Sequence, residues 1–314
     1  MIIEVSYNKY QSNWYVGELY DKFYKYLVSK YGNDVFFTPM ETLSKKNGYN
    51  VGTHDLSIFN IYNLIVTNKK TNKTFIHSFS DYAPAMMDDN SGILKFDVAS
   101  FSCVSNLTNK IIEDYSPKYK IIPSFYILEQ ISDLDFIQSN FKKTKGFNKI
   151  YFNGLCYGHR DRYKNIFKKN NYFVFKNKSN NLDYLNKSNY FSEVSKYNFG
   201  FSLNGAAKIC YRDLEYFGLG ILCLRENLDI IMDEPLISGF HYLNIIDEDI
   251  NQKLYIDSEI DYINDKINHK INDLILRDEY YEIINNAKKW YINNCLIDNQ
   301  LKKLELFLIK SEII

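Results

Sequence analysis

Cysteine is scarce and scattered in this 314-residue chain, which has five cysteines and no CxxC pair. An odd number of widely separated cysteines argues against a disulfide framework and against a closely spaced pair of thiolate metal ligands. We therefore interpret all five as buried free thiols in a protein that works in a reducing compartment. They are Cys103, Cys156, Cys210, Cys223 and Cys295.

The sequence also lacks an excess of either sign of charge. Lysine and arginine together number 38, and aspartate and glutamate also number 38, so the formal net charge is zero. A general nucleic-acid-binding protein carries a broad basic surface, and a balanced chain does not provide one. We expect no nucleic-acid partner, although a local basic pocket is still allowed.

Long apolar runs and targeting features are absent as well. No stretch approaches the roughly 18 uncharged apolar residues that indicate a membrane-spanning helix. The opening residues, MIIEVSYNKY, form a short apolar stretch with neither a basic region before it nor an extended apolar core. We expect no signal peptide, no membrane span and a cytoplasmic location.

The composition that remains is typical of a globular protein, with 46% hydrophobic and 24% charged residues. The length exceeds one ordinary core and suits two domains of roughly 150 residues each. Segments with strand and helix patterns alternate along the first half. There we expect strands at residues 2–7, 34–37, 57–67, 74–79, 95–103 and 118–122, of which 57–67 and 74–79 would form a hairpin, and helices at 18–29 and 106–115.

The alternation restarts near residue 147. Strands are expected at 149–152, 172–175, 199–203 and 221–224, helices at 160–169 and 208–217, and nearly continuous helix from about residue 260. Repeated strand–helix–strand units imply parallel sheets with crossover helices. The expected fold class is therefore α/β, with two Rossmann-like doubly wound domains facing a cleft. We divide the chain into residues 1–146, residues 147–285 and a last helical segment at 286–314.

The most informative segment is 197–224, where a strand runs into Asn204-Gly205-Ala206-Ala207 before the expected helix. Small residues let a ligand approach the backbone, and a helix N-terminus offers free N–H groups and a positive dipole. On the expected helix, Lys208, Arg212 and Glu215 share one face. Lys208 and Arg212 would then bind the phosphates of a nucleoside diphosphate, and Glu215 would accept its ribose hydroxyls. The alternative is a solvated helix with an ordinary Arg212–Glu215 pair.

A second segment, FNGLCYGHRDR at 152–162, also favours an anionic ligand. It follows a strand with a glycine-containing loop and places three basic side chains at an expected helix start. Cations oppose the dipole at a helix N-terminus, so this arrangement makes most sense with an anion between them. The alternative is a solvated basic patch. The three side chains are His159, Arg160 and Arg162.

These two segments, in this order, resemble the donor domain of GT-B glycosyltransferases, and in particular the exostosin-like and CAP10-like groups, with fucosyltransferase-like enzymes as further relatives. The shared pattern is a strand, FxGxxxxxR and a helix, followed later by KYxFxxxLxGxxxxxxRxxEyxxxGxxxL. EPLISGFHYLNI at 234–245 resembles a strand of CAP10-like enzymes. AKKWYINN at 287–294 resembles the C-terminal helix that returns to the first domain in GT-B proteins. The resemblance covers roughly 149–295.

The resemblance implies a glycosyltransferase that moves a sugar from a nucleoside-diphosphate sugar to a glycan or other hydroxyl acceptor. Inversion at the sugar is expected, with no metal and no cofactor besides the donor, and with the acceptor on the first domain. Position by position, Arg160 or Arg162 and Arg212 become the diphosphate contacts, Glu215 the ribose contact, and the loop at Gly205 lies against the phosphates. The family has a small polar residue before its arginine, where this chain has Cys210-Tyr211.

An inverting transfer needs a general base on the acceptor side. We expect Asp81, which closes a strand, with His54, Asp55 and His77 as further candidates. His241 either lies near the nucleotide or packs as a satisfied strand histidine.

Three other functions fit the same residues. They are a sugar-nucleotide epimerase on the same fold, a non-catalytic protein that binds a sugar, glycan or nucleotide, and an interaction protein whose basic residues are solvated. The sequence leaves open the donor sugar and base, the acceptor and the oligomeric state.

Overall fold

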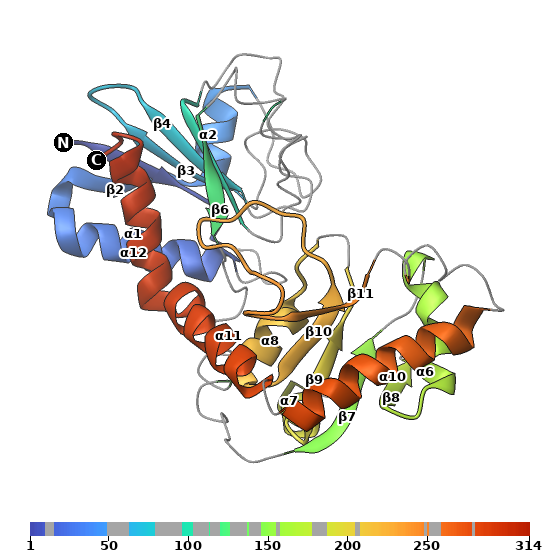
Figure 1. Ribbon diagram of the computed structural model, residues 1–314. Coiled ribbons are helices and arrows are strands. Elements are labelled where there is room, and N and C mark those ends of the chain that lie inside the picture. The colour runs from blue at the N-terminus through green and yellow to red at the C-terminus, as the bar shows by residue number, and fades with distance from the viewer. Residues whose placement is uncertain are drawn as a thin grey trace.

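The structure is a computed structural model in which two β-sheets, each accompanied by helices, form two lobes (Figure 1). The N-terminal lobe contains a six-stranded sheet and the C-terminal lobe a five-stranded sheet. The structure describes residues 1–9, 16–48, 63–78, 96–102, 113, 120–125, 137, 146–154, 158–177, 187–204, 208–247, 250, 259–277 and 280–314.

The first sheet is mixed, with the strand order β2-β1-β3-β4-β5-β6. Strand β1 pairs in parallel with β2 and antiparallel with β3, and β3 pairs antiparallel with β4. Strands β5 and β6 continue in parallel from β4. The strands are β1 (Ile3–Ser6), β2 (Val35–Phe37), β3 (Asn63–Asn68), β4 (Thr74–Ser78), β5 (Val98–Ser102) and β6 (Lys120–Phe125).

The hairpin expected from the sequence is confirmed by β3 and β4, within the residues described. The expectation of a parallel sheet is wrong for β3, because a hairpin connection reverses one of the two strands that it joins. Helix α1 (Val16–Tyr31) packs on this sheet through Leu19 and Phe23, in a core shared with Ile3, Val5 and Phe75. Helix α2 (Met40–Lys46) follows β2.

The second sheet is parallel throughout its strands and has the order β11-β10-β9-β7-β8. The chain passes from β7 to β8 on one side and then crosses to β9 on the other. The strand order therefore reverses between β7 and β9, as in doubly wound proteins, and the expected Rossmann-like fold class is confirmed. The strands are β7 (Phe147–Gly154), β8 (Phe173–Asn177), β9 (Tyr197–Ser202), β10 (Leu222–Glu226) and β11 (Leu243–Ile246).

Alternate residues of the central strands face two different layers of helices. Phe199 and Phe201 of β9 pack in one core with α6 (Lys164–Lys169) and α10 (Ile260–Arg277). The 3-10 turn η2 (Gly158–Tyr163) directly precedes α6. Gly200, between them, faces α8 (Tyr211–Leu219), and a Cβ on Gly200 would lie 2.5 Å from the Tyr216 ring. Helix α7 (Lys187–Val194) contributes Phe191 and Val194 to the core on the α8 side.

The last two helices carry the chain from the second lobe back to the first (Figure 1). Helix α11 (Tyr280–Cys295) packs on α8, and α12 (Ile297–Lys310) packs on α1. Glu305 of α12 accepts hydrogen bonds from Tyr26 at 2.6 Å, Lys30 at 2.5 Å and Tyr31 at 2.6 Å. The expected return of the C-terminal helix is confirmed, while the division at residues 146 and 285 stays a prediction.

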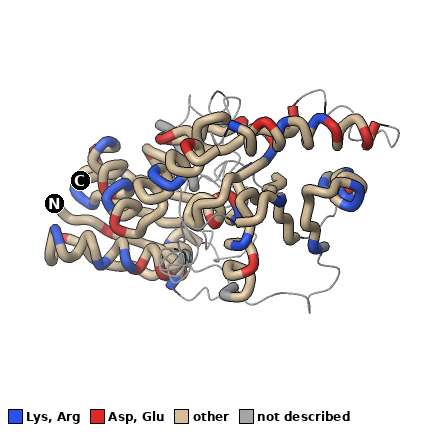
Figure 2. Tube along the Cα trace, turned by 60° about the horizontal axis from the view of Figure 1, so that its bottom comes forward, with Lys and Arg blue, Asp and Glu red and all other residues tan. Residues whose placement is uncertain are grey.

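In the described part of the chain, both signs of charge are spread over the elements and do not gather into one stripe (Figure 2). The local charge pattern therefore agrees with the balanced composition. Among the described helices, none combines the length and the apolar character that crossing a membrane requires.

Candidate functional site

The carboxyl edge of the second sheet brings the C-terminal ends of β7, β9 and β10 together. Ligands of doubly wound proteins bind outside this edge, at the point where the strand order reverses. That point lies between β7 and β9. Asn153, near the end of β7, is 5% exposed, and Ser202, at the end of β9, is fully buried. We take this edge as the candidate site.

Arg212 reaches the edge from the first turn of α8. Its Nη2 donates a hydrogen bond to the backbone oxygen of Asn153 at 3.0 Å, and its guanidinium carbon lies 4.8 Å from the centre of the Phe152 ring. Gly154 makes room for the guanidinium, because a Cβ at position 154 would lie 2.6 Å from Arg212 Nη2. The end of β7 therefore forms a seat that fits Arg212.

Among the described residues, the buried atoms without a hydrogen-bond partner at this edge include Arg212 Nη1, Asn153 Oδ1 and Ser202 Oγ. The parallel register pairs Tyr151 with Gly200, so Asn153 and Ser202 are neighbours two residues further along β7 and β9. A buried polar group left without a partner costs about 1–3 kcal/mol, so such groups usually meet a ligand or water. The guanidinium N–H and the hydroxyl can donate to an anionic group, whereas the amide oxygen would accept from a hydroxyl or N–H of the same ligand.

Arg160 approaches the same edge from η2. Its Nε donates to the backbone oxygen of Asn204 at 2.7 Å, and its Nη2 donates to that of Leu203 at 3.2 Å. Within the described part of the chain, neither Arg160 nor Arg212 forms an ion pair with a carboxylate. The edge therefore carries two guanidinium charges without a paired counter-ion.

Arg162 differs from Arg160 because a carboxylate already pairs with it. Its Nη2 lies 3.0 Å from Glu226 Oε1, and both side chains are at most 14% exposed. Glu226 also accepts hydrogen bonds from the Tyr163 hydroxyl and from the side-chain amide of Asn204. Burial and the nearby Glu226 raise the pKa of Tyr163, which keeps its hydroxyl protonated. Of the two arginines Arg160 and Arg162, Arg160 is therefore the better candidate for a phosphate contact, because Glu226 already pairs with Arg162.

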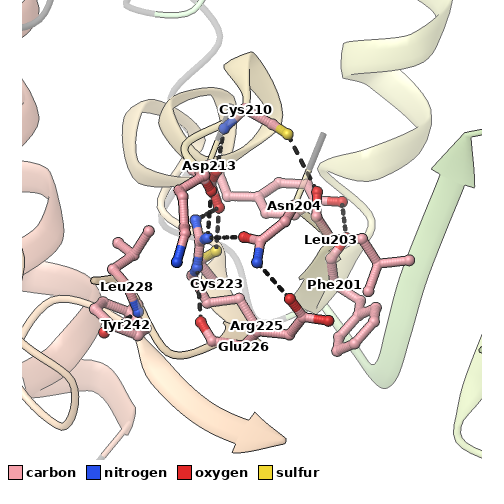
Figure 3. A network of polar contacts seen from close by, with 12 residues as sticks. Phe201, Leu203, Asn204, Cys210, Asp213, Cys223, Arg225, Glu226, Leu228 and Tyr242 are labelled. Carbon is pink, nitrogen blue, oxygen red and sulfur yellow. Dashed lines mark hydrogen bonds and ion pairs between the residues drawn. The ribbon is translucent and has the colours of Figure 1, made fainter. Parts of the chain in front are cut away.

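A buried ion pair that the sequence analysis missed lies behind the edge (Figure 3). Arg225 of β10 and Asp213 of α8 are fully buried, with Arg225 Nη1 2.6 Å from Asp213 Oδ1. Asp213 Oδ2 accepts the backbone N–H of Cys210 at 2.7 Å, which caps the start of α8. The signal in the sequence was Arg225 itself, a charged residue directly after the apolar run 221–224. Its partner Asp213 lies 12 residues earlier, on another element.

Lys208 does not lie on α8, which begins at Tyr211 with Cys210 as its N-cap. The expectation that Lys208 shares a helix face with Arg212 and Glu215 is therefore wrong. Its backbone oxygen accepts a hydrogen bond from Arg225 Nη2 at 2.6 Å. A phosphate contact by the Lys208 side chain stays a prediction.

Glu215 lies on α8 one turn after Arg212, as expected. It accepts a hydrogen bond from Tyr190 of α7, and burial followed by the charge of Glu215 raises the pKa of Tyr190. The negative charge of Glu215 also favours the charged state of Arg212. Its predicted contact with a ribose stays a prediction.

His241 lies in the connection between β10 and β11 and is 8% exposed. Its Nδ1 accepts the backbone N–H of Ile237 at 3.0 Å, and burial lowers its pKa, so the ring is neutral with its proton on Nε2. Glu234 in the same connection is anchored to α11 and α12, through Asn294 at 2.9 Å and Lys303 at 2.9 Å. This geometry favours the structural interpretation of His241, while its nucleotide contact stays a prediction.

Several predicted residues fall outside the described residues, namely Asp81, Gly205, His54 and Asp55, together with the side chain of His159. His77, the remaining base candidate, is fully buried, and its Nδ1 lies 3.3 Å from Ser100 Oγ. Burial lowers its pKa to about 3. A neutral ring with no exposed surface does not suit a general base that must meet a substrate.

No three His, Cys, Asp or Glu side chains of the described residues converge as they would around a metal ion. Three groups define the candidate site within this part of the chain. Arg212 is bonded to the end of β7, and Arg160 is bonded to the two residues after β9. Glu226, at the end of β10, is bonded to Arg162, Tyr163 and Asn204.

Comparison with known proteins gives likenesses among solved structures. No family model matches the sequence, and no curated protein matches it. Among solved structures, the pneumococcal O-GlcNAc transferase GtfA, in complex with UDP and GlcNAc, superimposes with a TM-score of 0.41 at 12% identity. The superposition covers 69% of this chain and 45% of that protein, so this chain spans less than half of its length.

Proposed function

We propose that the carboxyl edge of the second sheet binds a nucleoside-diphosphate sugar and that the protein transfers the sugar to a hydroxyl acceptor. The observation that carries the proposal is Arg212, which lies against Gly154 where the strand order reverses and whose buried Nη1 has no hydrogen-bond partner among the described residues. A phosphate oxygen supplies the acceptor that this atom lacks. Arg160, which forms no ion pair with a described carboxylate, contributes the second positive charge that a diphosphate requires.

In this proposal Arg212 and Arg160 bind the diphosphate in the donor and stabilise the charge that develops on it as the sugar leaves. Fixed cations at a site of developing negative charge are an effective form of catalysis, because they need no reorganisation during the reaction. The resemblance assigns the ribose to Glu215 and the general base to the first lobe, with Asp81 as the predicted base. The proposal also includes inversion at the sugar and independence of a metal ion, both of which rest on the same resemblance.

A binding panel tests the first half of the proposal. UDP, GDP, UDP-GlcNAc, UMP and inorganic phosphate are titrated into the wild type and into Arg212→Ala, with thermal unfolding followed in parallel. A nucleoside diphosphate at 100 times its dissociation constant should stabilise the wild type by about 2.7 kcal/mol. The same ligand should stabilise Arg212→Ala much less. If no nucleotide of the panel stabilises the wild type, the proposal fails.

A turnover assay tests the second half. Release of free nucleoside diphosphate is measured with and without a panel of glycan acceptors. Transfer requires release that depends on the acceptor, together with a glycosylated product of the expected mass. Saturable nucleotide binding with no turnover across the panel would support a non-catalytic binding protein instead. Conversion of the donor sugar without an acceptor would support an epimerase.

A further inference from the structure

Arg225 is a fully buried arginine whose guanidinium joins helix α8 to the connection between β9 and α8. Nη1 pairs with Asp213 of α8 at 2.6 Å. Nη2 donates to Asn204 Oδ1 at 2.8 Å (Figure 3). It also donates to the backbone oxygen of Lys208 at 2.6 Å. Neither Arg225 nor Asp213 has any exposed side-chain surface, so this pair cannot itself contact a ligand.

One branch of these contacts leads to Arg212. Asp213 holds Arg225 with Oδ1 and accepts the N–H of Cys210 with Oδ2, at 2.7 Å. That second contact fixes where α8 begins, and Arg212 is the second residue of the helix. The Arg225–Asp213 pair therefore sets the position from which Arg212 reaches the end of β7.

The other branch leads to Arg160. The Asn204 side chain is held at both ends, with Oδ1 accepting from Arg225 and Nδ2 donating to Glu226. The backbone oxygen of the same residue accepts the hydrogen bond from Arg160 Nε at 2.7 Å. Asn204 thus transmits the position of Arg225 to the guanidinium of Arg160.

We propose that Arg225 is a positioning residue that fixes Arg160 and Arg212 relative to each other at the edge of the second sheet. The role rests on the proposed function, in which these two side chains bind one diphosphate. Arginine suits the position because its planar fork reaches several acceptors in fixed directions, whereas lysine presents a single point charge. A buried ion pair is weak evidence for stability, since well-packed apolar residues often replace one without loss of stability.

Two variants separate positioning from folding. Arg225→Lys keeps a positive charge beside Asp213 but cannot also reach Asn204 and Lys208. The double variant Arg225→Met with Asp213→Leu removes both buried charges and so leaves none unpaired. The control is Arg277→Lys, which alters an exposed arginine at the end of α10. We expect Arg225→Lys and the double variant to unfold within a few degrees of the wild type, yet to bind UDP at least tenfold more weakly.

The Cys210 thiol provides a test that needs no ligand. Its Sγ donates to the backbone oxygen of Leu203 at 3.1 Å and lies 3.7 Å from Arg160 Nη2, so it reports on the same segment. Labelling with N-ethylmaleimide is followed by mass spectrometry of the peptide that contains Cys210. The fully buried Cys295 serves as the internal control for global opening. We expect Arg225→Lys to speed labelling of Cys210 at least fivefold and to leave that of Cys295 unchanged.

The two measurements separate this proposal from the proposed function. If Arg225→Lys binds UDP within twofold of the wild type and labels Cys210 at the wild-type rate, the positioning role is overturned. If both variants lose binding only in proportion to a large loss of thermal stability, with Cys295 labelled equally fast, the role is structural and the proposal is again overturned. If the wild type binds no nucleotide, the proposed function fails, and the labelling of Cys210 alone decides whether Arg225 fixes this segment.

Discussion

Gly154 lies directly against the guanidinium of Arg212, and a Cβ at position 154 would come within 2.6 Å of Arg212 Nη2. The next nearest atom to such a Cβ is Phe152 Cζ, at 3.2 Å. A glycine is therefore needed at position 154 to make room for the Arg212 side chain, and not because the backbone requires a conformation that other residues avoid. It links the end of β7 to the first turn of α8, the two elements that form the candidate site.

Gly154→Ala should weaken nucleotide binding with little loss of stability. The atom displaced by the new methyl group is the end of a flexible side chain, which can move at small cost. We expect the free energy of unfolding to fall by less than about 1.5 kcal/mol, near the low end of overpacking costs. The dissociation constant for UDP should rise at least tenfold, because the displaced guanidinium leaves its seat.

Gly200→Ala provides the contrast for this prediction. Its Cβ would lie 2.5 Å from the buried Tyr216 ring, so this variant should lose stability, by roughly 1–3 kcal/mol. Calorimetric titration and urea unfolding of both variants check the difference. The seat for Arg212 is refuted if Gly154→Ala binds UDP as tightly as the wild type does.

Arg212→Ala should remove most of the proposed transferase activity. Loss of one preorganised group that stabilises developing charge costs roughly 2.7–4 kcal/mol of transition-state stabilisation, a hundredfold or more in kcat. Arg212→Lys should recover only part of this, because an ammonium cannot donate to Asn153 and a phosphate with the geometry of a guanidinium. Arg277→Ala, at an exposed site on α10, serves as the matched control. Turnover of Arg212→Ala within a few-fold of the wild type on the correct donor would contradict the assignment.

Most of the strands could be predicted from the sequence because they depend on local patterns, whereas helices α2 and α7 were not expected. The strand expected at 199–203 corresponds to β9, and the helix expected to end at residue 217 ends two residues later, before Gly220, which has a left-handed conformation with φ of 70°. Gly220 closes the helix because a residue without Cβ adopts this conformation at little cost. These features need no information from distant parts of the chain.

The start of α8 could not be predicted in the same way. Cationic periodicity suggested a helix from Lys208, but the helix begins after Cys210, where the Asp213 carboxylate accepts the Cys210 N–H. Cysteine is not among the usual N-cap residues, so the sequence carried a weak signal. Asp213 is in turn held by Arg225, which is a tertiary contact. The sequence therefore predicted that Arg212 lies on a helix, but it did not predict the contacts of Asp213 and Arg225 that fix where this helix begins.

Glu305 should stabilise the contact between α12 and α1 in a pH-dependent way. Burial opposes its ionisation, but hydrogen bonds from Lys30, Tyr26 and Tyr31 outweigh burial and lower its pKa. A carboxylate with a lowered pKa stabilises the fold above its ordinary value, about 4.3, and this contribution is lost as pH falls through the lowered pKa. Glu305→Gln should cost roughly 1.5–3 kcal/mol at pH 7, the range for a hydrogen bond to a charged group.

Urea unfolding of Glu305→Gln at pH 7 and near pH 3 checks this prediction. The difference from the wild type should shrink as the pH is lowered, because the wild-type carboxyl takes up its proton as the pH falls through the lowered pKa. Glu312→Gln is the matched control, since Glu312 is 77% exposed and pairs with Lys73 on the surface. If Glu305→Gln loses the same free energy of unfolding at both pH values, the negative charge of Glu305 does not stabilise the contact with α1.

His77 should make the folded protein less stable as pH falls below about 6.5, the ordinary pKa of histidine. Burial holds its pKa at about 3 in the folded state, so in this interval the unfolded chain binds a proton that the folded chain does not. Stability therefore rises with pH, by up to about 1.4 kcal/mol per unit between pH 3 and 6.5. His77→Gln removes the titrating group and should flatten the dependence measured by urea unfolding between pH 7.5 and 4.5. His269→Gln, at a 79% exposed position on α10, should keep the wild-type slope, and equal slopes in all three proteins would exclude His77 as the source.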